Sequence, residues 1–212
     1  MAASRRHGSP SGMRARGASA LGLVSEMPSG PGVIPEEAIA KITSAVPPFV
    51  TSVLLTSERD ASSILEQHRR CGTNAIQICD EIGISALDEL RRRLSGVKII
   101  QVIHVRGEEP VEEATSVAPH VDAVLLDSGD PSLRVKELGG IGRIHDWEIS
   151  RRIRESVGVP VILAGGLDPG NVAEAIRRVR PYSVDVCSGV RTGGRLDESK
   201  LGEFFKQVTN SL

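Results

Sequence analysis

The chain has 212 residues, a length that suits a single domain. Its 26 basic and 27 acidic residues give a formal net charge of −1, so charge supports neither nucleic-acid binding nor attachment to a membrane surface. Apolar residues make up 40% of the sequence and aromatic residues only 2%, which favours an aliphatic core of buried parallel strands. Three cysteines, with neither CxxC spacing nor a secretory signal, predict reduced thiols and a cytoplasmic location. The longest apolar runs have the length of a strand, which argues against a membrane span.

Residues 1–16 are rich in Ser, Arg and Gly, and we expect a disordered or misassigned segment there, with a targeting segment as the alternative.

One phosphate-binding barrel domain then covers residues 17–212. Within it, aliphatic runs of strand length alternate with helical patterns. The expected strands are 20–24, 50–55, 73–79, 97–105, 121–127, 160–164 and 183–187. The expected helices are 35–45, 60–70, 85–94, 111–116, 147–156, 169–178 and 198–208.

This alternation predicts an α/β protein with a parallel sheet and helices outside it. Because a closed barrel normally has eight such units, we expect a TIM (β/α)8-type barrel that is incomplete at its N-terminal side, with about seven βα units. A doubly wound sheet is the structural alternative. It normally carries a glycine-rich signature after its first strand, and the loop at residues 27–32 does not spell GxGxxG.

Glycines follow the last two expected strands. Gly165 and Gly166 stand between a strand and a helix, and Ser188 and Gly189 follow the next strand. Glycine lets backbone N–H groups approach an anion closely, and a helix start adds a favourable dipole. Two such turns side by side are the usual phosphate site of these barrels, whereas ordinary tight turns are the alternative reading. The loop ending at Gly142 is either a further anion-binding loop, a lid or a simple connector.

Two carboxyl groups are candidates for chemistry at the same end of the sheet. Asp127 ends an aliphatic strand, where catalytic groups of barrels point into the mouth, and a carboxyl there can act as a general acid. Asp185 lies within the last expected strand, 183–187, and either faces the mouth and contacts substrate or anchors a loop. Cys79 also ends a strand, but a buried cysteine is usually an inert apolar residue rather than a thiolate base.

Residues 121–206 resemble the phosphoribosylanthranilate isomerase family. The strings AVLLDS, GGIGRIHDW, PVILAGGLDPGNVAEAI, SVDVCSGVRTGGRLD and LGEFF follow that family's order and spacing. The resemblance extends over about residues 17–208. It implies an Amadori rearrangement in tryptophan biosynthesis, without cofactor or metal, which converts N-(5-phosphoribosyl)anthranilate to a 1-deoxyribulose phosphate.

The resemblance also implies roles for individual residues. Asp127 matches the family's general acid, and Asp185 matches a substrate-contacting position. The phosphate-binding loops correspond to Gly142, Gly165, Gly166, Ser188 and Gly189. The implied partner is a small phosphorylated sugar-anthranilate, with no nucleic acid or membrane, and the chain is expected to be a monomer or a homodimer.

One departure of the sequence from the family's pattern concerns the catalytic base. The family's general base is a Cys at the end of the first strand, in a Lys-Ile-Cys-Gly-like motif, and no such motif occurs here. We therefore expect impaired catalysis by this chain. The alternatives are an inactive relative that still binds a sugar phosphate, or another phosphate-barrel enzyme such as an epimerase or indole-glycerol-phosphate synthase.

Overall fold

The computed structural model describes residues 17–28, 30–106, 109–129 and 144–211. At its centre lies a seven-stranded sheet in which every strand is parallel to its neighbours and follows them in chain order. The strands are β1 (Ala20–Val24), β2 (Thr51–Thr56), β3 (Ala75–Ile78), β4 (Lys98–His104), β5 (Ala123–Asp127), β6 (Val161–Leu163) and β7 (Ser183–Val184).

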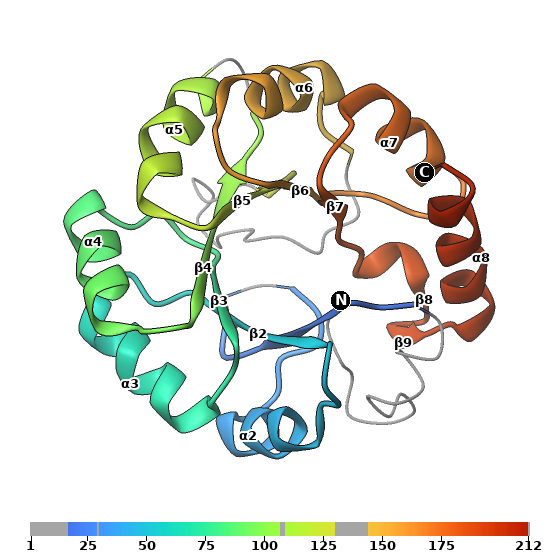
Figure 1. Cartoon of the computed structure of the whole chain (residues 1–212). Helices are drawn as coiled ribbons and strands as arrows, with labels where there is room; N and C mark the ends of the chain where they lie inside the picture. The colour runs from blue at the N-terminus through green and yellow to red at the C-terminus, as the bar shows by residue number, and fades with distance from the viewer. Residues whose placement is uncertain (1–16, 29, 107–108, 130–143, 212) are drawn as a thin grey trace.

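Helices connect these strands and form an outer ring around the curled sheet (Figure 1). They are α2 (Glu36–Ala45), α3 (Ala61–Cys71), α4 (Ile84–Arg93), α5 (Pro110–Val117), α6 (Trp147–Ser156), α7 (Val172–Val179) and α8 (Glu198–Thr209). The predicted α/β barrel architecture, with seven strands alternating with helices, is therefore confirmed for the described residues.

Side-chain alternation along each strand separates two apolar layers. In β5, Val124 and Leu126 belong to the large core beneath the helices, whereas Leu125 belongs to a small inner cluster with Val102 and Ala164. Successive side chains of a strand point to opposite faces, so Asp127 faces the same side as Leu125. The strand pattern thus directs the candidate acid inward, toward the axis of the curled sheet.

The two edge strands leave a gap on one side of the sheet. Among the described residues, β1 pairs only with β2, and β7 pairs only with β6. Helix α8 covers this side from outside, because Phe205 packs against Ala18 and Leu21 of the β1 region while Phe204 belongs to the main core. A cavity of about 390 Å³ lies between the edges, lined by residues of β1, β7 and α8 and by inward side chains such as Leu125 and Ile162.

Several boundaries differ from the sequence-based prediction. The last strand is shorter than expected, so Asp185 lies just beyond it. Short elements were not predicted: η1 (Ala118–His120), η2 (Ser188–Val190) and a hairpin of β8 (Arg191–Thr192) and β9 (Arg195–Leu196). Residues 1–16 and Gly142 lie outside the described part of the chain. No helix within that part is long and apolar enough to cross a membrane.

Candidate functional site

Asp127 stands at the carboxyl end of β5 and is half-buried. Its Oδ1 atom accepts a hydrogen bond of 2.6 Å from the backbone N–H of Ser128, which fixes the orientation of the carboxyl group. On the neighbouring strand, His104 stands directly opposite Asp127 in the β4–β5 register. The Nε2 atom of His104 lies 3.0 Å from the carbonyl oxygen of Cys79 and, because a carbonyl only accepts, donates its hydrogen to it.

The first glycine turn lies directly against the residue that follows Asp127. Gly165 and Gly166 have φ angles of +76° and +64°, values that favour glycine. A Cβ atom added to Gly165 would lie 2.8 Å from Nδ1 of His145 and 2.9 Å from the backbone nitrogen of Ser128. The turn therefore approaches the end of β5 so closely that no side chain fits between them.

The second glycine turn touches the first. A Cβ atom on Gly189 would lie 1.9 Å from the carbonyl oxygen of Leu167 and 2.9 Å from Cβ of Asp168. The structure thus brings Asp127, the turn at residues 165–168 and the turn at residues 188–189 to one end of the sheet, and we call these residues the rim site. Sequence reasoning predicted this convergence.

Side-chain hydrogen bonds hold the first turn of the rim site in place. Asn171 donates from Nδ2 to the carbonyl oxygen of Gly166 at 2.9 Å, and its Oδ1 accepts from the N–H of Asp168 at the same distance. The Oδ1 atom of Asp168 accepts in turn from the N–H of Gly170. Helix α7 begins at Val172, so its N-terminal end follows this turn. Backbone N–H groups and a helix start at one place favour the binding of an anion such as phosphate.

Asp185 lies two strands away from Asp127. Its backbone N–H donates to Leu163 of β6 at 2.8 Å, which continues the pairing of β7 just past the end of that strand. Asp185 lines the cavity between the edge strands, but neither Asp127 nor the glycines of the rim site do so. The cavity and the rim site are therefore different places. We assign chemistry to the rim site because polar and backbone groups converge there, whereas apolar side chains dominate the cavity lining.

Cys79 lies inside the curled sheet but is a poor candidate for a base. It is buried in the inner cluster with Val102 and Leu125. Burial raises the pKa of its thiol to about 12, and the negative charges of Asp127 and Asp185 contribute to this shift. The thiol is therefore protonated near neutral pH, which agrees with the interpretation of Cys79 as an inert residue. Within the described ranges, no group of three or more His, Cys, Asp or Glu side chains is arranged to hold a metal ion.

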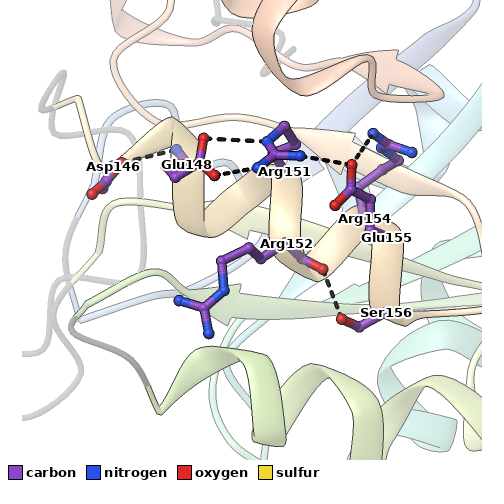
Figure 2. A network of polar contacts seen from close by, with 7 residues as sticks. All are labelled: Asp146, Glu148, Arg151, Arg152, Arg154, Glu155 and Ser156. Carbon is purple, nitrogen blue, oxygen red and sulfur yellow. Dashed lines mark hydrogen bonds and ion pairs between the residues drawn. The ribbon is translucent and has the colours of Figure 1, made fainter.

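His145 is a residue of the site region to which sequence reasoning assigned no role. It immediately precedes Asp146, whose side chain accepts from the N–H of Glu148 and caps helix α6. Beyond this cap, the exposed face of α6 carries ion pairs of Arg151 with Glu148 and Glu155 (Figure 2). Only the position of His145 between a glycine-rich loop and a helix start was visible in the sequence.

Comparisons with known proteins agree on one family. A sequence model described as N-(5′-phosphoribosyl)anthranilate (PRA) isomerase matches residues 12–207. The N-(5′-phosphoribosyl)anthranilate isomerase of Methanocella arvoryzae is 38% identical over 193 residues, which is 91% of this chain and 88% of that protein.

Solved structures give the same result. Phosphoribosyl anthranilate isomerase from Thermotoga maritima has a TM-score of 0.79 and 30% identity, covering 93% of this chain and 91% of that one. A phosphoribosyl anthranilate isomerase in complex with reduced 1-(o-carboxyphenylamino)-1-deoxyribulose 5-phosphate has a TM-score of 0.77 and 28% identity with the same coverage.

Proposed function

This chain belongs to the N-(5′-phosphoribosyl)anthranilate isomerase family, and we propose that it isomerises N-(5′-phosphoribosyl)anthranilate at the rim site. The reaction is the Amadori rearrangement of tryptophan biosynthesis. An acid protonates the furanose ring oxygen as the ring opens to a Schiff base. A base then removes the proton on C2, and the resulting enolamine tautomerises to the ketone of 1-(2-carboxyphenylamino)-1-deoxyribulose 5-phosphate.

One observation carries the assignment to the rim site: the contact of the Gly165 turn with Ser128, together with the contact of Gly189 with Leu167. These contacts set the acid and the backbone N–H groups at fixed positions relative to one another. A substrate whose phosphate lies on the two turns then presents its ring to Asp127. Holding the reacting groups in this way lowers the entropic part of the barrier.

In this proposal, Asp127 is the general acid. The N–H of Ser128 donates to Oδ1 and so holds the carboxyl group in one orientation. Gly165, Gly166, Ser188 and Gly189 bind the phosphate through backbone groups, and the start of α7 just after the first turn favours this binding. Gly142 contributes a further phosphate contact, and Asp185 contacts the sugar.

The chemistry needs acid and base groups only, so the proposal includes neither a cofactor nor a metal. We further propose that the protein is a cytoplasmic monomer or homodimer that acts on a small molecule. The rate is expected to be low, because the Lys-Ile-Cys-Gly-like motif that carries the family's base does not occur in the sequence. A general base typically contributes about 10²- to 10⁴-fold to such a rate.

The test is a steady-state assay of the purified chain, of Asp127→Asn and of the control Asp88→Asn, with N-(5′-phosphoribosyl)anthranilate as substrate. Asp88 lies on α4, half-exposed, and pairs with His120. We expect slow turnover by the unaltered chain, a further fall of about 10²- to 10⁴-fold in kcat for Asp127→Asn, and a change below about twofold for Asp88→Asn. Equal kcat values for the unaltered chain and Asp127→Asn would show that the carboxyl group of Asp127 takes no part in the reaction.

A further inference from the structure

His145 joins helix α6 to the rim site. Its Nε2 atom lies 2.7 Å from the hydroxyl oxygen of Ser150, which is fully buried on α6. On the other side of the ring, Nδ1 would be 2.8 Å from a Cβ atom on Gly165. The imidazole therefore spans the space between the first turns of a helix and the turn that we propose binds phosphate.

The contact of the ring with the Gly165 turn is steric. The Nδ1 atom is buried and has no hydrogen-bond partner among the described residues. Burial also lowers the pKa of His145 to about 4, so the ring is uncharged at neutral pH. With neither a charge nor a hydrogen bond on that side, the ring touches the turn through its volume, while the bond to Ser150 fixes its orientation.

The same contact reaches Asp127 indirectly. The hypothetical Cβ position on Gly165 is also 2.9 Å from the N–H nitrogen of Ser128 and 3.1 Å from its hydroxyl oxygen. That N–H is the donor to Oδ1 of Asp127. Because these distances share one reference point, His145 and Ser128 border the same side of Gly165, the side toward which a Cβ atom would point.

We propose that His145 is a positioning residue of the rim site, whose ring fills the space beside Gly165 that Ser128 also borders and so fixes the distance between the phosphate-binding turn and Asp127. This inference rests on the proposed function of the rim site. Without the ring, the turn gains room to shift into the emptied space and so to change its distance from β5. A displacement of about 1 Å between reacting groups can cost on the order of 10²-fold in rate.

The experiment compares His145→Ala, His145→Val and His145→Phe with the unaltered chain and the control His68→Ala. His68 is also half-buried and also makes one hydrogen bond, of 2.8 Å to Thr73, but it lies on α3 beside the amino end of β3. Two quantities are measured for each variant. They are kcat/KM for N-(5′-phosphoribosyl)anthranilate and the dissociation constant of reduced 1-(o-carboxyphenylamino)-1-deoxyribulose 5-phosphate by calorimetry.

We expect His145→Ala and His145→Val to weaken binding of the analogue by about tenfold or more and to lower kcat/KM by about 10- to 100-fold. His145→Phe, which restores a ring of similar volume, is expected to stay within about threefold of the unaltered chain in both quantities. His68→Ala is expected to change neither. Inclusion of His145→Val keeps the test valid if the alanine variant fails to fold.

Two results would overturn the inference. If a folded His145→Val variant keeps the affinity for the analogue and the kcat/KM of the unaltered chain, His145 has no positioning role. Equal losses in His145→Phe and His145→Val would mean that the polar ring atoms, rather than the ring volume, matter. Failure of the proposed function has a different signature, because the unaltered chain itself would then neither turn over the substrate nor bind the analogue.

Discussion

The contact between the two glycine turns of the rim site gives the most specific prediction, made with Gly189→Ala. The added Cβ atom would lie 1.9 Å from the carbonyl oxygen of Leu167 and 2.9 Å from its carbonyl carbon, whereas real Cβ atoms almost never come closer than 3.0 Å to another heavy atom. The Leu167 atoms belong to the backbone, and the Cβ atom of Asp168, also at 2.9 Å, does not move when its side chain rotates, so no side-chain rotation relieves the overlap. The two turns must separate by more than 1 Å.

This separation is expected to affect function more than stability. Insertion of a methyl group into a packed region typically costs about 1–3 kcal/mol, which the fold can survive. A shift of about 1 Å in a phosphate-binding turn can lower the rate by on the order of 10²-fold. We therefore expect Gly189→Ala to fold, to unfold at a lower urea concentration than the unaltered chain, and to lose about 10- to 100-fold in kcat/KM.

The matched control is Gly158→Ala. Gly158 lies between α6 and β6, nothing lies within 4 Å of its hypothetical Cβ atom, and its φ angle is not in the left-handed range. This variant is expected to be slightly more stable, by up to about 1 kcal/mol, because alanine restricts the unfolded chain. Urea unfolding and the isomerase assay measure both variants. If Gly189→Ala has the same kcat/KM as Gly158→Ala, then separation of the two glycine turns does not impair the rim site.

Three further predictions concern groups near or beyond the rim site. Cys79→Ala is expected to keep kcat within about threefold, because burial raises the pKa of the thiol to about 12; a loss of 10²-fold in the steady-state assay would identify Cys79 as a base after all. The pKa of His145 is lowered to about 4 from 6.5, so its contribution to stability is complete above pH 6.5 and is lost as the pH falls toward 4. The stability lost in this range is at most about 3 kcal/mol. Urea unfolding measures it, and a free energy of unfolding that falls as steeply between pH 7 and 4 in His145→Phe as in the unaltered chain would contradict the prediction. Arg151→Ala is expected to shift Tm by less than about 2 °C, because exposed ion pairs contribute little; a larger shift in calorimetry would give the network of Figure 2 a structural role.

The strands were predictable because each is a short aliphatic run set between helical patterns. Asp127 was expected to point into the mouth because it ends a barrel strand. In the structure, Val124 and Leu126 pack under the helices while Leu125 faces inward, and this alternation puts Asp127 on the inner face as well. The position of the glycine turns followed from the common direction of parallel strands, whose carboxyl ends meet at one edge. The roles of these residues in catalysis and phosphate binding stay predictions, and Gly142 lies outside the described residues.

The close contacts at the rim site were not predictable, since they depend on how separate loops meet in space. Nothing in the sequence around Gly189 indicates that its Cα lies against Leu167, 22 positions earlier in the printed sequence. The role inferred for His145 likewise depends on its contacts with Gly165 and Ser150. The short β7 strand is a further example. The strand ends at Val184, one more backbone bond joins Asp185 to β6, and the chain then enters the short helix at Ser188, a change of direction that an apolar run does not encode.

The most direct test of the account is a crystal structure of this chain with reduced 1-(o-carboxyphenylamino)-1-deoxyribulose 5-phosphate. We expect the phosphate at the backbone N–H groups of Gly165, Gly166 and Gly189, with the carboxyl group of Asp127 within hydrogen-bond distance of the sugar portion. A ligand bound in the cavity between β1 and β7, or a phosphate far from both glycine turns, would contradict it.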